Sequence, residues 1–283
     1  MTVRHVLEID DLRPEELDEV LRRAAEPPGG RPLAGRTVGL YFEKPSLRTR
    51  HSSEAAVVQL GGHPVTFRRE EVGSGEREPV TDIARVLSGY HAVIGARVFD
   101  HGLLEELAAA ATIPVVNLLS DRGHPCQALA DLLTMRQQLG DLEGATVAWV
   151  GDFNNVARSL ALGATMMGMK VRLACPPGYG PTDADIDRLA ALGAPPVVTG
   201  RPTEAVAGAA AGAAAAALAA RSSASLAAVP FSGSLTLLLS SAPSSSWATS
   251  STSAFSTCRA ADTSSTPSVI ITRQNGQPVA IVV

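Results

Sequence analysis

Short apolar runs alternate with amphipathic segments along the first 200 residues of the chain. The short apolar runs predict buried strands, and segments with apolar residues three or four positions apart predict helices. The predicted strands are 35–42, 63–67, 92–96, 113–119, 145–151 and 170–176. The predicted helices are 11–25, 47–62, 80–87, 103–111, 126–139 and 154–168. This alternation is typical of parallel sheets that are covered on both faces.

The length of 283 residues is enough for two domains of ordinary size. We expect an α/β protein with two doubly wound domains and parallel sheets, of which the second is incomplete. The break between the domains fits the end of the long helix at Gly140. The expected division is 1–135, 136–209 and 210–283.

Residues after about 205 differ in kind from those before. Beyond Glu204 the sequence holds no Lys or Glu, and its charged residues are Arg221, Arg259, Asp262 and Arg273. A folded domain normally combines a charged surface with a patterned core. We therefore expect 210–283 to be a low-complexity tail rich in Ala and Ser. Its end, 270–283, is more typical of a hairpin with an Asn-Gly turn than of a helix.

Charge and composition narrow the class of function. The net charge of -4 gives no reason to propose nucleic acid or an anionic membrane as the main partner. The polar start of the chain lacks the apolar core of a signal peptide, and no long apolar stretch predicts a membrane span. The three cysteines are odd in number and widely spaced. They predict neither a disulfide framework nor a metal site, and the cytoplasm is the simplest setting.

The stretch "KPSLRTR", from Lys44 to Arg50, places cations where a strand turns into a helix. Arg at a helix N-terminus is unfavourable unless an anion joins it. Ser46 is at the N-cap position, so free N–H groups, the hydroxyls of Ser46 and Thr49, and Arg48 would converge. This pattern favours a phosphate site, although it is not a P-loop. A plain capped helix with solvated Arg side chains is the alternative.

Three further polar positions follow predicted strands. Arg97 comes directly after strand 92–96, and strand carboxyl ends face the ligand crevice in such sheets. His124 precedes a helix whose first turn contains Gln127, so both side chains can reach one small ligand. Asn155 follows strand 145–151 and could bind the polar end of a substrate. Each of these residues taken alone has a structural alternative. Arg97 could be a surface residue without a partner, His124 a structural histidine, and Asn155 part of an Asx turn.

Two neighbours of these residues are given structural roles. Asn154 is the candidate for an Asx turn or helix cap beside Asn155. Cys126 is expected to pack rather than to act as a nucleophile, because no base is identifiable beside it.

Taken together, in order and spacing, four motifs resemble the aspartate/ornithine carbamoyltransferase family. They are "SLRTR" at 46–50, Arg97, "HPCQ" at 124–127 and "GDFNNV" at 151–156. The resemblance extends from about residue 5 to about 209, and "HPCQALADL" with the Asn-Asn pair is similar to the ornithine branch.

The resemblance implies transfer of a carbamoyl group from carbamoyl phosphate to L-ornithine, in arginine metabolism. It implies two α/β domains, no cofactor and a homotrimer. Its phosphate ligands would be Ser46, the Leu47 backbone, Arg48 and Thr49. Arg97 and His124 would polarise the carbamoyl carbonyl, Gln127 would bind the carbamoyl amide, and Asn155 and Leu119 would contact ornithine.

The sequence departs from the family in two places. Leu47 stands where the family usually has Thr, so a hydroxyl is lost and weaker phosphate binding is expected. The segments Asp-x-x-x-Ser-Met-Gly and His-Cys-Leu-Pro, which the family uses at the ornithine site, are absent. Our hypothesis is that the tail is out of frame in a GC-rich gene.

These departures leave alternatives open. The chain could be an ornithine carbamoyltransferase, active or inactive as written. It could be a non-catalytic remnant that binds carbamoyl phosphate. It could also be a carbamoyltransferase for another amine, such as putrescine or an acylated ornithine.

Overall fold

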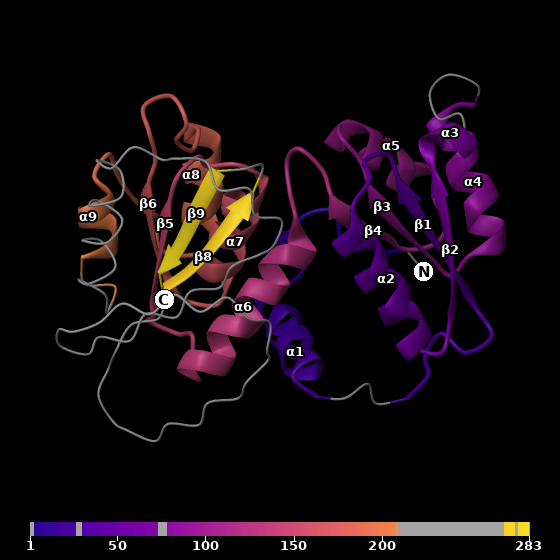
Figure 1. Cartoon of the computed structure of the whole chain (residues 1–283), viewed down its shortest axis with the longest axis horizontal. Coiled ribbons are helices and arrows are strands. Elements are labelled where there is room, and N and C mark those ends of the chain that lie inside the picture. The colour runs from indigo at the N-terminus through magenta and orange to yellow at the C-terminus, as the bar shows by residue number, and fades with distance from the viewer. Residues whose placement is uncertain are drawn as a thin grey trace, which may run out of the picture. The chain divides into compact units, whose positions relative to one another are not determined.

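The computed structural model describes residues 3–26, 30–72, 78–207, 209, 269–274 and 277–282. The backbone forms two compact units, which are described separately (Figure 1). Unit 1 comprises Met1–Ala145, Asp152–Val171 and Gly178–Pro196. Unit 2 comprises Thr146–Gly151, Arg172–Pro177 and Val197–Val283. Helices and strands alternate in both, so the predicted α/β class is confirmed.

Unit 1 is built on a four-stranded parallel sheet in the order β2-β1-β3-β4. Its strands are β1 (Thr37–Phe42), β2 (His63–Arg68), β3 (Val93–Arg97) and β4 (Val115–Leu119). Phe42, the last residue of β1, pairs with Arg68 on one side and Arg97 on the other. The strands therefore end together, and the loops that follow them share one edge of the sheet.

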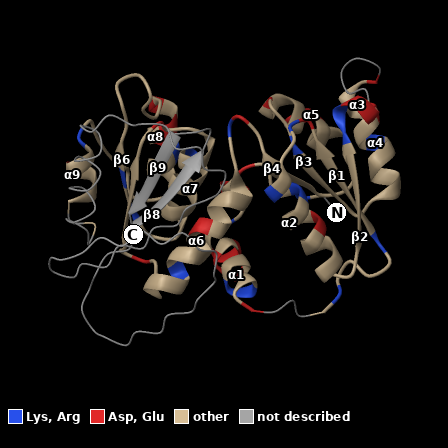
Figure 2. Ribbon diagram, viewed as in Figure 1, with Lys and Arg blue, Asp and Glu red and all other residues tan. Residues whose placement is uncertain are grey.

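The helices of unit 1 follow the pattern expected from the sequence, with small differences at their ends. They are α1 (Pro14–Ala24), α2 (Leu47–Gln59), α3 (Arg69–Val72), α4 (Val80–Tyr90), α5 (His101–Ala110), α6 (Pro125–Leu139), α7 (Asn155–Met166) and α8 (Asp183–Leu192), after the short 3-10 helix η1 (Ile9–Asp11). Neither α3 nor α8 was among the predicted helices. Acidic and basic residues are interspersed along these helices (Figure 2).

Both faces of the sheet are covered, as a doubly wound arrangement requires. Val38, Leu40 and Phe42 of β1 pack with Val57 of α2 on one face. Tyr41 points to the other face, into a cluster with residues of α4 and α5. Successive strand residues thus serve opposite faces, which explains why the strands read as continuous apolar runs.

Helices α6 and α7 pack closely because of a glycine. A Cβ at Gly163 would lie 2.9 Å from Cδ1 of Leu132, so a larger residue would push the helices apart. Nearer the start of α6, the backbone N–H of His124 bonds the hydroxyl of Ser159 on α7. A partly buried ion-pair cluster also ties α8 to the N-terminal segment, since Arg188 bonds Glu8 at 3.0 Å and Asp10 at 2.6 Å.

Unit 2 holds a five-stranded mixed sheet in the order β7-β6-β5-β9-β8. Its elements are β5 (Thr146–Val150), β6 (Lys170–Ala174), β7 (Val197–Thr199), α9 (Pro202–Val206), β8 (Val269–Gln274) and β9 (Gln277–Val282). β6 and β7 are parallel, in agreement with the parallel sheets predicted, although β7 was not among the predicted strands. In contrast, β9 pairs antiparallel with both β5 and β8, so the second sheet is mixed.

The hairpin predicted for 270–283 is confirmed in its two strands, which pair antiparallel. Its Asn275-Gly276 turn lies outside the described residues. The low-complexity stretch predicted from 210 also lies outside them, apart from the hairpin strands.

Candidate functional site

The start of α2 gathers hydrogen-bond donors at the carboxyl edge of the parallel sheet. Ser46 is the N-cap, and its hydroxyl oxygen accepts from the backbone N–H of Thr49 at 3.4 Å. The Ser46 hydroxyl in turn donates to Thr49 Oγ1 at 3.0 Å. The predicted cap is therefore confirmed. The other N–H groups of the first turn have no partner within the helix, and they give this helix end a partial positive charge.

Arg97, at the end of β3, reaches the same helix turn. Its Nη1 donates to Thr49 Oγ1 at 3.2 Å, and its backbone carbonyl accepts from Glu43 N–H at 2.9 Å. Its Nε is buried and has no hydrogen-bond partner among the described residues. Burial lowers the pKa of Arg97, and the nearby positive charge of Arg48 lowers it further. No carboxylate of the described residues forms an ion pair with either guanidinium.

His124 is the N-cap of α6, with Pro125 at the first helical position as predicted. Its backbone N–H donates to the hydroxyl of Ser159 on α7 at 2.8 Å. Its Nδ1 is buried without a hydrogen-bond partner in the described chain. Burial, assisted by the charge of Arg97, lowers the pKa of His124 to about 4. The imidazole is therefore neutral at pH 7 and offers one N–H donor.

Gln127 lies in the first turn of α6, and its side chain bonds the buried Asp131 one turn further on. Gln127 Nε2 donates to Asp131 Oδ1 at 2.9 Å. Burial raises the pKa of Asp131 to about 6, against the opposing effect of this hydrogen bond. The carboxylate is thus ionised near neutral pH but has lost most of its hydration.

Asn155 opens α7, beside its cap. Asn154 accepts from the N–H groups of Val156 and Ala157, which confirms it as a cap. The amide of Asn155 donates to the backbone carbonyl of Ser120 at 2.6 Å. Ser120 directly follows Leu119, the half-buried last residue of β4. Asn155 and Leu119 thus lie on neighbouring backbone segments.

Most of the predicted residues therefore fall into two groups, one at the start of α2 and one at the start of α6, and Arg97 interacts with both. Hydrogen bonds join Ser46, Thr49 and Arg97, and charge interactions connect Arg97 to Arg48 and to His124. Helix α6 continues this series from His124 to Gln127. Leu47 is 75% exposed, and its side chain carries no polar group. Its backbone N–H is therefore the group that can bind an anion together with Ser46 and Thr49.

Three residues next to the site have contacts of a structural kind. Cys126 packs against the sheet, and burial raises the pKa of its thiol to about 11, which agrees with a packing role. Arg50 donates to Glu54 at 2.8 Å. Lys44 lies over the Phe99 ring, 5.6 Å from its centroid.

Sequence reasoning missed several supports of the site. Asp131 and Ser159 bond Gln127 and His124 directly. Buried Ser120 bonds the ring of His101 at 2.7 Å and the amide of Asn117 at 3.1 Å, which fixes the loop before His124. One signal was available, because Asp131 is a single acid within the apolar run "ALADLL".

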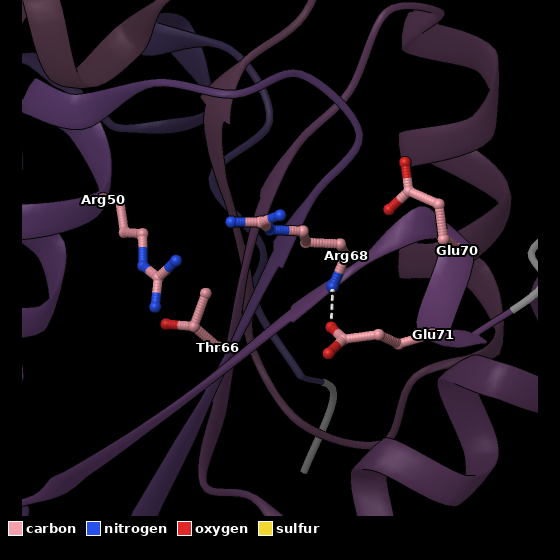
Figure 3. A pocket seen from close by; sticks show the side chains of 5 residues that line it. All are labelled: Arg50, Thr66, Arg68, Glu70 and Glu71. Carbon is pink, nitrogen blue, oxygen red and sulfur yellow. Dashed lines mark hydrogen bonds between the residues drawn. The ribbon is translucent and has the colours of Figure 1, made fainter.

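A separate pocket of about 420 Å³ lies between α2, β2 and α3. Its lining residues are Arg50, Thr66, Arg68, Glu70 and Glu71 (Figure 3). The backbone N–H of Arg68 donates to Glu71 at 2.6 Å, while Arg50 reaches toward Thr66. Charges of both signs line it, and none of the predicted ligand residues does.

The described ranges contain neither a metal site nor a membrane-spanning helix. No group of His, Cys, Asp and Glu there has the arrangement of a metal site. No helix in the same ranges is long and apolar enough to cross a membrane.

Two domain families match the chain in succession. The aspartate/ornithine carbamoyltransferase carbamoyl-P binding domain matches residues 4–137, and the Asp/Orn binding domain of the same name matches 143–211. These matches and the parallel sheet define the class of the protein, which is a carbamoyltransferase.

Individual relatives agree with this assignment. The ornithine carbamoyltransferase of Haloquadratum walsbyi is 46% identical over 206 residues, which is 72% of this chain and 69% of the relative. That of Acidothermus cellulolyticus is 50% identical over 198 residues, 68% of this chain and 63% of the relative. The chain belongs to the aspartate/ornithine carbamoyltransferase family.

Solved structures give the same result for the fold. The crystal structure of ornithine carbamoyltransferase from Thermus thermophilus has a TM-score of 0.66 and 45% identity, and the match covers 72% of this chain and 71% of that one. The ornithine carbamoyltransferase from Pyrococcus furiosus has a TM-score of 0.67 and 39% identity, with 72% and 68% covered.

Proposed function

We propose that the carboxyl edge of the parallel sheet binds carbamoyl phosphate, and that the chain was built to transfer its carbamoyl group to L-ornithine. The products would be L-citrulline and phosphate, in arginine metabolism. One observation carries the proposal: the bonded set of Ser46, Thr49 and Arg97 lies at a helix N-terminus without a described carboxylate to neutralise it. Such a set favours a bound anion.

The phosphate end of the ligand would bind at the start of α2. Ser46 and Thr49 would supply hydroxyl donors, Leu47 its backbone N–H, and Arg48 its charge. The helix N-terminus adds to their effect because its partial charge is positive. These groups would also stabilise the departing phosphate.

The carbamoyl carbonyl would face Arg97 and His124. When the amine attacks the carbonyl carbon, negative charge grows on the carbonyl oxygen. A well-placed preorganised donor stabilises such charge by about 3–4 kcal/mol. His124 would act as a neutral donor, because its pKa is lowered to about 4. Gln127 would bind the carbamoyl amide.

The amine substrate would lie on the side of Asn155 and Leu119. Binding both reactants in one orientation removes much of the entropic barrier. The attacking amine must be neutral, so turnover should fall as the pH is lowered. The proposal also includes the division of the chain into 1–135, 136–209 and 210–283. It further includes a cytoplasmic location and assembly as a homotrimer, and the family membership supports these parts.

A second function is favoured by a specific observation in the sequence. The segments Asp-x-x-x-Ser-Met-Gly and His-Cys-Leu-Pro are absent, so half of the family's ornithine site is missing. The chain would then bind carbamoyl phosphate without turnover. An acceptor amine other than ornithine is the third candidate, because these same segments select the amine.

Citrulline formation by this polypeptide, together with calorimetric binding of inorganic phosphate, separates these functions. Turnover with ornithine supports the transferase. Phosphate binding without turnover supports the binding protein, and turnover with putrescine or an acylated ornithine alone supports the third candidate. Absence of both turnover and phosphate binding contradicts all three. Translation of the other two frames beyond codon 209 tests the frameshift, which fails if neither frame encodes the two segments.

A further inference from the structure

The buried carboxylate of Asp131 is unusual in its choice of partner. It lies one helical turn after Gln127 on α6, and Gln127 Nε2 is its hydrogen-bond partner among the described residues, at 2.9 Å. No Lys or Arg of the described chain pairs with it. A buried carboxylate without a cation is costly, and a hydroxyl or an amide could bond Gln127 at lower cost.

What a carboxylate alone offers is a group that accepts and never donates. Burial raises the pKa of Asp131 to about 6, so it remains ionised at pH 8. An ionised carboxylate requires the NH₂ end of the Gln127 amide, whereas Asn, Ser or Thr would tolerate either end. Asp131 therefore fixes which end of Gln127 turns away from it, and that end is the oxygen.

The oxygen of Gln127 is also kept available. A Gln at the third helical position commonly accepts from the backbone N–H of the N-cap residue. Here the N–H of the N-cap residue, His124, already donates to Ser159 at 2.8 Å. No donor among the described residues bonds Gln127 Oε1. The oxygen is left as an acceptor in the first turn of α6, the turn that His124 caps and where the carbamoyl group is proposed to bind.

We propose that Asp131 is a positioning residue that sets the selectivity of the site for an amide over other acyl phosphates. It holds Gln127 so that Oε1 accepts an N–H from the ligand. An acetyl group has the same shape as a carbamoyl group but a methyl in place of the NH₂. Such a ligand would leave Oε1 unpaired. This inference rests on the proposed function, because it assumes that phosphate binds at the start of α2.

Two phosphonates of matched shape test the inference in this polypeptide. Phosphonoacetamide carries the amide, and 2-oxopropylphosphonate carries a methyl ketone in its place. By calorimetry at pH 8 we expect the wild-type chain to prefer the amide by about tenfold, the value of one well-made hydrogen bond. In Asp131→Asn the preference should fall to about threefold or less, since both orientations of Gln127 become possible. Affinity for inorganic phosphate should stay the same.

Controls separate this role from a general effect on folding. Asp187→Asn makes the same change at an exposed residue of α8 and should keep the full preference. Gln127→Met should abolish the preference with Asp131 in place, so the inference stays testable even if Asp131→Asn does not fold. Gln138→Met, at an exposed position of the same helix, should keep it.

The outcomes are distinct. An unchanged preference in folded Asp131→Asn, or in Gln127→Met, overturns the role of Asp131 but leaves the phosphate site standing. A wild-type chain that binds neither phosphonate nor phosphate overturns the proposed function and this inference together. A reduced preference with unchanged phosphate affinity supports the inference.

Discussion

Helices α2 and α6 both begin at the carboxyl edge of the same parallel sheet, yet their first turns carry opposite chemistry. The start of α2 holds hydroxyls and arginines, with Arg97 bonded to its Thr49. The start of α6 holds a neutral imidazole and an amide, and an acid is buried one turn further on. The difference suggests a site with two ends, one for an anion and one for a neutral polar group.

Removal of a cation from the α2 end should have the largest effect. We expect Arg97→Met to weaken phosphate binding by at least about a hundredfold, as loss of one partner of a buried charge-assisted bond does. The pKa of His124 should also rise, because the charge of Arg97 helps to lower it. Calorimetry and NMR titration measure the two effects. Arg85→Met, an exposed change on α4, is the matched control, and equal affinities in the two variants would contradict a phosphate role for Arg97.

The pH dependence of stability tests the buried imidazole of the α6 end. The pKa of His124 is lowered from 6.5 to about 4, so its contribution is present above pH 6.5 and is lost as the pH falls toward 4. His124→Gln should remove this dependence. When the pH is lowered from 7.5 to 4, the free energy of unfolding should therefore fall by about 2–3 kcal/mol less in the variant than in the wild type. Urea unfolding at both pH values measures it, and parallel pH profiles would show that the imidazole is not buried.

Asp131 should affect stability in the opposite direction. Its pKa is raised from 3.8 to about 6, so ionisation destabilises the folded chain as the pH rises through this range. Asp131→Asn should therefore increase the free energy of unfolding by about 2 kcal/mol at pH 8 and have little effect at pH 4. Gain of stability with loss of amide selectivity would mark a residue kept for function. A loss of stability at pH 8 would mark a structural residue instead.

The smallest expected effect concerns the exposed Leu47. Leu47→Thr adds a hydroxyl to the first turn of α2, which should strengthen phosphate binding by about fivefold, or about 1 kcal/mol. Val58→Thr makes a similar change at an exposed position of the same helix and should leave binding unchanged. If the two variants bind phosphate equally well, the turn of Leu47 does not face the anion.

The α2 end of the site could be predicted from sequence because its signals are local. Ser46 caps the helix that comes after β1, and Arg97 is the last residue of β3, so topology alone brings them to one edge. His124 and Gln127 could be placed at the start of α6 in the same way, because Pro125 marks the first position of that helix.

The supports of the α6 end could not be predicted in this way. Whether Asp131 is buried depends on how α6 packs, and the partner of His124 lies 35 residues away on α7. Similarly, the pairing of β9 with β5 joins segments that are far apart in sequence. Local patterns predicted the strands of that hairpin but not where it would pair.

The bond between His124 N–H and Ser159 has a consequence for hydrogen exchange. Amide protons at the start of a helix normally exchange quickly with water, because they lack partners within the helix. The amide of His124 is held by a buried hydroxyl of another helix, at 2.8 Å. Its exchange rate would therefore report how often α6 and α7 separate. Measured on this one amide proton, that rate would give the frequency with which the α6 end of the site opens.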